Sequence, residues 1–370
     1  MYLGKRGEAV TLIVLVLALI GIGVASFYFS QEGITAATVY GGDGAADCQT
    51  TVTESSTLTG DVGPCLSKHG LVLGGNDIEI DCNGYRIIGN YDANRYGVYN
   101  DGYPNITIKN CNLSDFQIGI LFDGSTTAIN NGTLFNNTLH SNTDGIKLTS
   151  SVDNIIINET TIFNSSITGI WIDTCNGVNV TSCNISESGS QDVYIQGRAG
   201  LPDSHLLFNN SIGGKINLDG STNNITVYNN DFWNVSSIID LGSDNVWNTT
   251  YDCSQTNIKG GRCVGGNFFS NYTGNDTDDD GIGNDSNYNA GSNVDYLPLV
   301  QVYSFTTIDP GTLGGDLSVN STFNSTNPMT GGSVHSTPQN ITLVNLTDNR
   351  RYLTVLAYFN ESVNIRDTTL

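Results

Sequence analysis

A repeat of 22 to 26 residues is the feature that most limits how this chain can fold. The copies begin at Gly97, Gly119, Gly145, Gly169, Asp192, Lys215 and Ile238. Most copies carry two apolar residues two positions apart, such as Ile146 and Leu148. A spacing of two puts both side chains on one face of a strand, so each copy predicts one short strand.

Each repeat holds two further strand-like segments. The second segment has the apolar pairs Ile106/Ile108, Ile155/Ile157, Val178/Val180, Leu206/Phe208 and Ile225/Val227. The third has Leu113, Leu139, Ile162, Ile185, Ile212 and Phe232. Three short strands per turn predict an all-β chain, a right-handed parallel β-helix of about 8–9 coils. One coil cannot bury its own apolar face, so stacked coils supply the core.

Small polar residues recur two positions before the apolar residue of the third strand. They are Cys111, Asn137, Thr160, Cys183, Asn210 and Asn230. Side chains stacked at one corner of successive coils can hydrogen-bond to one another, so we expect a polar ladder along the helix.

The net charge is −22, and only 14% of the residues are charged. Nucleic-acid binding needs a basic surface that neutralises phosphates, so nucleic acid is not an expected partner. An acidic surface attracts cations, Ca²⁺ above all, although it also simply keeps a protein soluble.

The cysteines predict disulfide bonds. The count of eight is even, and there is no Cys-x-x-Cys sequence that would indicate zinc. We expect the pairs Cys48–Cys65, Cys82–Cys111 and Cys253–Cys263, with Cys175–Cys183 a weaker fourth. Buried free thiols are the alternative.

Three segments carry a resemblance to a known family. They are Thr57–Cys65, the Gly-Ile repeat, and the closing sequence that runs from Gly265 through Gly283 to Val294–Leu299. The chain resembles the NosD-like, or CASH-type, right-handed β-helix proteins of microbial cell envelopes, from about Ala46 to Val300. The resemblance implies an extracytoplasmic β-helix.

That family is also linked to copper delivery. Copper sites favour His, Met or Cys thiolate ligands. The chain has two Met and four scattered His, namely His69, His140, His205 and His335. We therefore do not expect a copper site.

An acidic loop predicts a structural Ca²⁺ site. Carboxylates, a glycine and a backbone carbonyl follow the order of an EF-hand loop, although no helices flank them. The predicted ligands are Asp276, Asp278, Asp280, the Ile282 carbonyl, Asn284 and Asn287. Asn287 replaces the usual bidentate Glu, so Asp285 or Asp295 could supply the last ligand. A solvated acidic turn is the alternative.

The coils do not carry the motifs of pectin-cleaving β-helices. Asn142-Thr-Asp144 occurs, but no Asp-Asp in the coils, Gly-His-Gly or Arg-x-Lys accompanies it. No stacked pair of carboxylates suggests acid–base catalysis. We expect no catalysis, with a polysaccharide-active enzyme that has an unrecognised site as the alternative.

Aromatic residues near the first coils suggest a binding role instead. Tyr91, Tyr96, Tyr99 and Tyr103 lie close together in the sequence, and exposed rings can stack on sugars. The expected partner is therefore a glycan or a neighbouring surface protein. About twenty Asn-x-Ser/Thr sequences, including those at Asn105 and Asn131, also predict that some Asn carry glycans.

The N-terminus predicts export. Lys5 and Arg6 precede an apolar run from Val10 to Phe29, which is long enough to span a bilayer as a helix. Positive charges before the run place the remainder outside the cell membrane, whether the run is a retained signal-anchor or a cleaved signal peptide.

We thus expect four regions. They are a signal-anchor or signal peptide (1–30), a linker (31–45), the capped β-helix (46–300) and a small β module (301–370), either complete or completed by a partner.

Overall fold

The computed structural model describes residues 37–39 and 47–301. Their regular structure is entirely strand. None of these residues belongs to a helix that is long and apolar enough to cross a membrane. The predicted apolar helix (10–29) and the predicted C-terminal module (301–370) lie outside the described residues, apart from residue 301.

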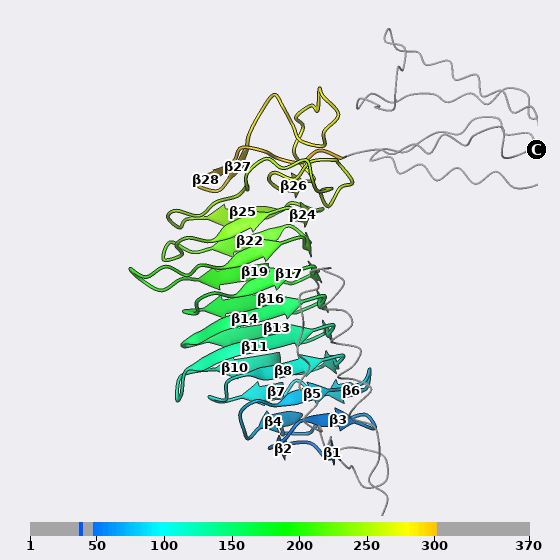
Figure 1. Ribbon diagram of the computed structural model, residues 1–370. Coiled ribbons are helices and arrows are strands. Elements are labelled where there is room, and N and C mark those ends of the chain that lie inside the picture. Colours follow the sequence, from blue (N-terminus) through cyan, green and yellow to red (C-terminus); the bar gives the residue numbers. More distant parts are fainter. Residues whose placement is uncertain (1–36, 40–46, 302–370) are drawn as a thin grey trace, which may run out of the picture. The chain divides into compact units, whose positions relative to one another are not determined.

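Three parallel sheets stack coil on coil (Figure 1). Sheet 1 contains β2 (Thr50–Val52), β4 (Leu71–Leu73), β7 (Tyr96–Asn100), β10 (Ile118–Asp123), β13 (Asp144–Thr149), β16 (Thr168–Asp173), β19 (Gln191–Gln196), β22 (Lys215–Leu218) and β25 (Ser237–Asp240). Sheet 2 contains β1 (Ala37–Val39), β3 (Ser56–Leu58), β5 (Glu79–Asp81), β8 (Ile106–Lys109), β11 (Ile129–Phe135), β14 (Val152–Asn158), β17 (Asn179–Thr181), β20 (Leu206–Phe208) and β23 (Thr226–Tyr228).

Sheet 3 contains β6 (Arg86–Ile88), β9 (Asn112–Ser114), β12 (Thr138–His140), β15 (Thr161–Phe163), β18 (Asn184–Ser186), β21 (Ser211–Ile212), β24 (Asp231–Phe232) and β26 (Phe268–Phe269). A small antiparallel pair, β27 (Tyr288–Ala290) and β28 (Asn293–Asp295), follows. The three sheets form a β-helix of about eight turns, which confirms the predicted fold class.

The inward side chains form one continuous apolar core. The predicted pairs, such as Ile146/Leu148 and Ile155/Ile157, are fully buried. The prediction is wrong by one residue in β20, where Leu207 is buried while Leu206 and Phe208 are partly exposed. The inward positions before Leu207 are occupied by Asp203 and His205, which are buried although they are polar. The pattern of apolar residues therefore did not reveal which side of this strand faces the core.

Close contact between coils explains why glycine is the second residue of several strands of sheet 1. A Cβ atom on Gly145 would lie 2.5 Å from the Gly169 carbonyl oxygen and 2.6 Å from the Ile162 side chain. Gly119 and Gly169 meet the same two kinds of neighbour in their own coils. Neighbouring coils therefore approach too closely at these glycine positions to leave room for a side chain.

The predicted polar ladder lies inside the corner before sheet 3. In four steps of the ladder, the backbone N–H of one coil donates to a side chain of the next: Cys111 to Asn137 Oδ1 (3.0 Å), Asn137 to Thr160 Oγ1 (3.4 Å), Cys183 to Asn210 Oδ1 (2.8 Å) and Asn210 to Asn230 Oδ1 (3.0 Å). These bonds satisfy donors that water cannot reach.

The ladder continues beyond the repeat. Asn230 N–H donates to Asn267 Oδ1 (3.1 Å), and Asn267 N–H donates to Asp295 Oδ2 (2.7 Å). Burial raises the pKa of the Asp295 carboxyl to about 7. Asp295 thus ties β28 to the coil stack, and it is not among the three carboxylates that converge in the acidic loop.

Residues with a left-handed backbone conformation turn the chain at the outer corners. Asn110 and Asn136 have φ of 56° and 50°, values that Asn tolerates better than most residues. Asn136 Nδ2 donates to Asn110 Oδ1 (2.7 Å), and Asn110 Nδ2 donates to Asp81 Oδ1 (2.9 Å). The abundance of Asn therefore has two causes, backbone conformation and coil-to-coil bonding.

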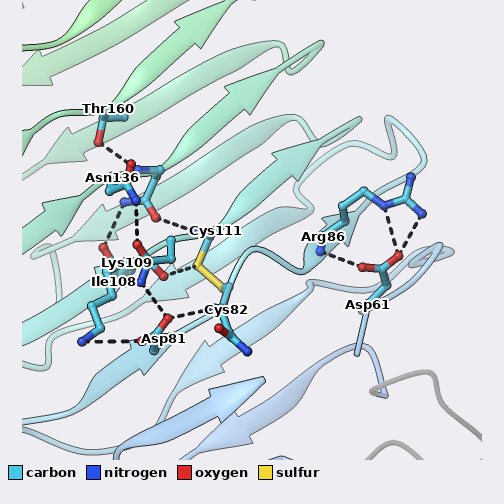
Figure 2. The surroundings of a disulfide bond; sticks show 12 residues. Asp61, Asp81, Cys82, Arg86, Ile108, Lys109, Cys111, Asn136 and Thr160 are labelled. Atoms are coloured by element: carbon cyan, nitrogen blue, oxygen red, sulfur yellow. Dashed lines mark hydrogen bonds and ion pairs between the residues drawn. A yellow bond between two sulfur atoms is a disulfide. The ribbon is translucent and has the colours of Figure 1, made fainter. Parts of the chain in front are cut away.

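Three disulfides occur, and they are the three preferred pairs: Cys48–Cys65, Cys82–Cys111 and Cys253–Cys263. Figure 2 shows Cys82–Cys111 joining adjacent coils beside the contacts of Asp81 and Lys109. These bonds restrict the unfolded chain, which favours the folded state.

The fourth predicted pair is wrong, because Cys175 and Cys183 are free and buried. Cys175 precedes β17 and Cys183 follows it. A strand rises about 3.3 Å per residue, and a disulfide needs Cα atoms within roughly 7 Å. Because an extended strand separates Cys175 from Cys183, their sulfur atoms cannot form a disulfide.

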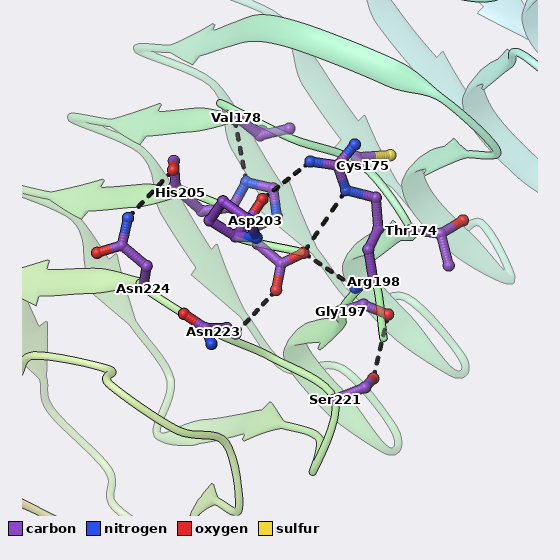
Figure 3. Close-up of polar contacts among 12 residues, drawn as sticks. Thr174, Cys175, Val178, Gly197, Arg198, Asp203, His205, Ser221, Asn223 and Asn224 are labelled. Carbon is purple, nitrogen blue, oxygen red and sulfur yellow. Dashed lines mark hydrogen bonds and ion pairs between the residues drawn. The ribbon is translucent and has the colours of Figure 1, made fainter. Parts of the chain in front are cut away.

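A polar cluster is buried between sheets 1 and 2 (Figure 3). Asp203 accepts hydrogen bonds from the N–H groups of Arg198 and Asn223, both at 2.9 Å. His205 Nδ1 accepts one from Val178 N–H at 3.0 Å. Burial, and secondarily the Arg198 charge, lowers the pKa of His205 to about 3. His205 is therefore neutral.

His205 should make the protein acid-labile. Its pKa is about 6.5 when unfolded and about 3 when folded, so only the unfolded state takes up the proton between these values. The contribution of His205 to the free energy of unfolding should fall by about 1.4 kcal/mol per pH unit as the pH drops through this window, and it should stay constant above pH 6.5. His205→Asn should flatten this part of the profile. Parallel urea-unfolding profiles for variant and wild type from pH 7 to 4 would contradict the account.

Asparagine suits that test because it makes the equivalent hydrogen bond at the corresponding position of another coil. Asn245 Oδ1 accepts a hydrogen bond from Ile225 N–H at 3.0 Å, which is the bond that His205 makes with Val178. The substitution therefore removes the titrating group and keeps the acceptor.

Candidate functional site

The outward residues of sheet 1 form a stripe across successive coils. Register pairs Tyr99 with Leu121, Leu121 with Lys147, Lys147 with Trp171 and Trp171 with Tyr194. We call these five residues the outer stripe. Each lies between two inward positions of its strand, because alternate residues face opposite sides.

One end of the outer stripe is aromatic, and a positive charge lies beside it. The rings of Trp171 and Tyr194 have centroids 5.7 Å apart, and both residues are partly exposed. Lys147 Nζ lies 3.3 Å from the centroid of the Trp171 ring, a cation–π contact. The stripe thus combines flat apolar surface with a hydrogen-bond donor.

A second aromatic group extends the outer stripe towards the first coils. His69 lies 4.9 Å from Tyr96 and 5.3 Å from Tyr99, and the two tyrosines are 5.2 Å apart, as measured between ring centroids. Burial, and then the Arg95 charge, lowers the pKa of His69. Burial, and then Asp101, raises the pKa of Tyr99 to about 12. Both rings are therefore uncharged near neutral pH.

A polar row runs beside the outer stripe on the same strands. Register pairs Asp123 with Thr149, Thr149 with Asp173, and Asp173 with Gln196. Thr149 Oγ1 donates a hydrogen bond to Asp173 Oδ2 at 3.0 Å. Rings bordered by hydroxyl, amide and carboxylate groups match a ligand that has one apolar face and a polar edge.

The four predicted tyrosines do not act as one group. Tyr96 and Tyr99 meet on sheet 1, whereas Tyr91 is 59% exposed in the preceding loop. Tyr103 packs against the core. Trp171 and Tyr194 were not predicted, although the sequence held their signal: each stands between the inward apolar residues of its repeat.

The acidic loop brings three of its predicted residues together. One carboxylate oxygen from each of Asp276, Asp278 and Asp280 lies within 4.8 Å of the others. Asp276 accepts hydrogen bonds from the N–H groups of Asp280 (3.1 Å) and Gly281 (2.8 Å). Tyr251 donates to Asp280 Oδ2 at 2.7 Å. Burial, followed by the Asp280 charge, raises the pKa of Asp276.

Other predicted ligands have separate surroundings. Asn284 Oδ1 accepts a hydrogen bond from Thr277 N–H at 2.7 Å, so it lies across the loop. Ile282 N–H donates to Asp280 Oδ1 at 2.8 Å. Asp285 binds the Asn275 side chain at 2.8 Å, and Asn287 is exposed. The three converging Asp are thus the centre of this candidate site.

The side chains of Asn142 and Asp144 bind backbone groups of adjacent coils. Asn142 Oδ1 accepts from Phe116 N–H at 3.0 Å, and its Nδ2 donates to Leu113 O at 3.1 Å. Asp144 Oδ1 accepts from Thr168 N–H at 3.1 Å. These bonds link adjacent coils, as the ladder bonds do.

The fold and its coil-to-coil ladders define the class of protein, a parallel β-helix. A family model described as "Periplasmic copper-binding protein (NosD)" matches residues 44–274, and the chain belongs to this family. That description agrees with the predicted location outside the cytoplasm.

Other comparisons add little. No curated protein matches the sequence. One solved structure, the catalytic domain of a GH87 alpha-1,3-glucanase in complex with nigerose, is similar at 11% identity and a TM-score of 0.27. The match covers 54% of this chain and 46% of that one, so this chain spans less than half of it. A similarity this distant carries no functional argument.

The described residues do not fit copper, the metal in the family's description. Copper favours His, Met or Cys thiolate donors. Within residues 47–301, both groups of three converging donors include Asp280, and neither contains His. The sulfur atoms in one group belong to the Cys253–Cys263 disulfide, so they offer no thiolate. The two free Cys and the His of the described region join neither group.

Proposed function

We propose that this protein is an extracytoplasmic β-helix that binds a glycan across the outer stripe of sheet 1. The observation that carries the proposal is the pairing of partly exposed Trp171 and Tyr194, with Lys147 over the indole ring. A pyranose ring has an apolar C–H face that packs on aromatic rings, and its hydroxyl groups reach the polar row. Successive sugars would contact successive coils.

Charge narrows the glycan class. The chain carries a net charge of −22, and Asp123 and Asp173 lie in the polar row beside the stripe. A polyanionic glycan would be repelled by this surface. A polysaccharide without acidic groups is therefore the proposed ligand.

Trp171→Ala should weaken binding of that polysaccharide about 10-fold, because loss of the ring contact removes about 1.4 kcal/mol. Calorimetry with neutral oligosaccharides measures the change. Trp233→Ala is the matched control, since Trp233 is 43% exposed and follows a strand of sheet 3. Equal affinities for all three proteins would remove the proposed site. Release of new reducing ends during the titration would instead favour the enzymatic alternative.

We also propose that the acidic loop holds a structural Ca²⁺ ion. Converging Asp276, Asp278 and Asp280 support this, because Ca²⁺ prefers several carboxylate and carbonyl oxygens. The Cys253–Cys263 loop lies against it, since Asp280 O accepts a hydrogen bond from Cys263 N–H at 3.0 Å. A bound ion would therefore stiffen the closing segment of the β-helix.

Calcium should raise the melting temperature by about 5 °C at 100 times its Kd, because it binds only the folded chain. Asp278→Asn should abolish the gain. Asp279→Asn is the control, because Asp279 is exposed in the same loop, and its φ of 57° suits Asn. A calcium-independent melting temperature in the wild type would disprove the site.

The apolar run at 10–29 supports one further part of the proposal, that the β-helix is tethered to the outer face of the membrane. Recovery of the protein in the salt-washed membrane fraction is the expected result, and recovery in the medium alone would contradict it.

A further inference from the structure

A groove lies on the outer face of sheet 2, away from the outer stripe. Its volume is about 270 Å³. It is lined by Asn131, Gly132, Thr133, Asn154, Ile156, Gly177 and Asn179. These residues belong to β11, β14 and β17 and to the corners before or within them, so three consecutive coils build the groove.

The groove lies where an outer ladder of side chains is interrupted. On one side, Asn131 Nδ2 donates to Asn105 Oδ1 (3.2 Å). On the other side, Asn224 Nδ2 donates to Ser204 Oγ (3.1 Å). Between these two pairs the corner residues are Asn154 and Gly177.

Glycine at this corner leaves an amide without a partner. Asn154 and Gly177 both have left-handed φ, 58° and 65°, as do the neighbouring corner residues. Gly177 offers no side chain, and the space where its Cβ would lie is 2.7 Å from Asn154 Oδ1. Within residues 47–301, the Asn154 side chain makes no hydrogen bond, so its donor and acceptor face the groove and solvent.

The lining chemistry selects the type of ligand. Ile156 is 43% exposed and offers an apolar surface. Amides of Asn154 and Asn179 and the hydroxyl of Thr133 surround it, and no lining residue is charged. The ligand therefore has one apolar face, several hydroxyl groups and no charge.

We propose that this groove is a second binding site, one that takes a single uncharged pyranose unit. Its volume is slightly below the roughly 300–1,000 Å³ of pockets for drug-sized ligands, which suits one ring. The site is independent of the outer stripe, because sheet 2 and sheet 1 present different faces of the coils.

Gly177→Asn tests the proposal without disrupting the corner. Asn tolerates positive φ, and the corners of the two preceding coils already carry it. The new side chain would extend into the groove and bond to Asn154, whose flexible amide can move aside. Ser204→Asn, at the next corner (φ 52°), is the matched control.

The protein should come from a host that does not glycosylate Asn, because Asn131 and Asn179 each begin an Asn-x-Thr sequence. Methyl glycosides of glucose, galactose, mannose and N-acetylglucosamine are titrated, and binding is followed by NMR. At least one should bind to wild type and to Ser204→Asn. Gly177→Asn should bind it at least 10-fold more weakly, with an unchanged or higher melting temperature.

Two results would overturn the proposal. One is that none of the four glycosides binds to the wild type. The other is that Gly177→Asn binds as the wild type does. If Trp171→Ala removes binding that Gly177→Asn retains, the groove is excluded as the site and the outer stripe is supported.

Discussion

Gly145→Ala is expected to lower the free energy of unfolding by about 3 kcal/mol or more. The added methyl group would lie 2.5 Å from the Gly169 carbonyl oxygen, well inside van der Waals contact. The obstacle is backbone of the next coil, so relief requires separation of two coils and of the strand pair β13–β16. Urea unfolding measures the loss.

Gly220→Ala is the matched control for that substitution. The nearest atom to its added Cβ, the Leu241 carbonyl oxygen, is 3.8 Å away. It should change stability by less than about 0.5 kcal/mol, as an open surface position does. Equal losses in the two variants would mean that coil contact does not explain the glycines of sheet 1.

Asn230→Ala is expected to cost about 3 kcal/mol or more, because it leaves several buried groups unpaired. Asn230 Oδ1 accepts hydrogen bonds from both Asn210 N–H (3.0 Å) and Asn210 Nδ2 (2.9 Å). Its own Nδ2 donates to Leu207 O at 2.9 Å. All of these atoms are enclosed between coils, where water cannot replace the lost partner.

Asn234→Ala serves as the control. Asn230 directly precedes β24, whereas Asn234 follows β24 and is exposed. It should leave the unfolding midpoint nearly unchanged. If Asn230→Ala is equally mild, the ladder fixes the geometry of the coils without contributing to stability.

Much of the fold was predictable because a β-helix repeats one local rule. Apolar residues two positions apart, such as Ile146 and Leu148, predict which face of a strand is buried. The polar residue before each third strand predicts the ladder of hydrogen bonds. The rule failed at Leu207, where polar Asp203 and His205 replace apolar inward residues. The disulfide prediction also failed for Cys175 and Cys183, although the predicted Val178/Val180 strand lies between them and holds them apart.

The candidate sites were less predictable, since they depend on register between coils. Tyr96 and Tyr99 are neighbours in the sequence, so their grouping was visible. Trp171 and Tyr194 are 23 residues apart, and they meet only because β16 and β19 pair in one register. The convergence of the three Asp in the acidic loop was predictable, because they lie within five consecutive residues.

The groove on sheet 2 could not have been predicted. Its signal is the absence of a side chain at Gly177, and glycine is common throughout this chain. Only the alignment of Asn154 and Gly177 at one corner distinguishes it.

The central claim is that glycan binds across the coils of sheet 1. A crystal structure of the protein with a bound neutral oligosaccharide tests this most directly. We predict sugar rings in contact with Trp171 and Tyr194, with hydroxyl groups bonded to the polar row. An oligosaccharide bound elsewhere on the molecule, with the outer stripe left empty, would contradict it.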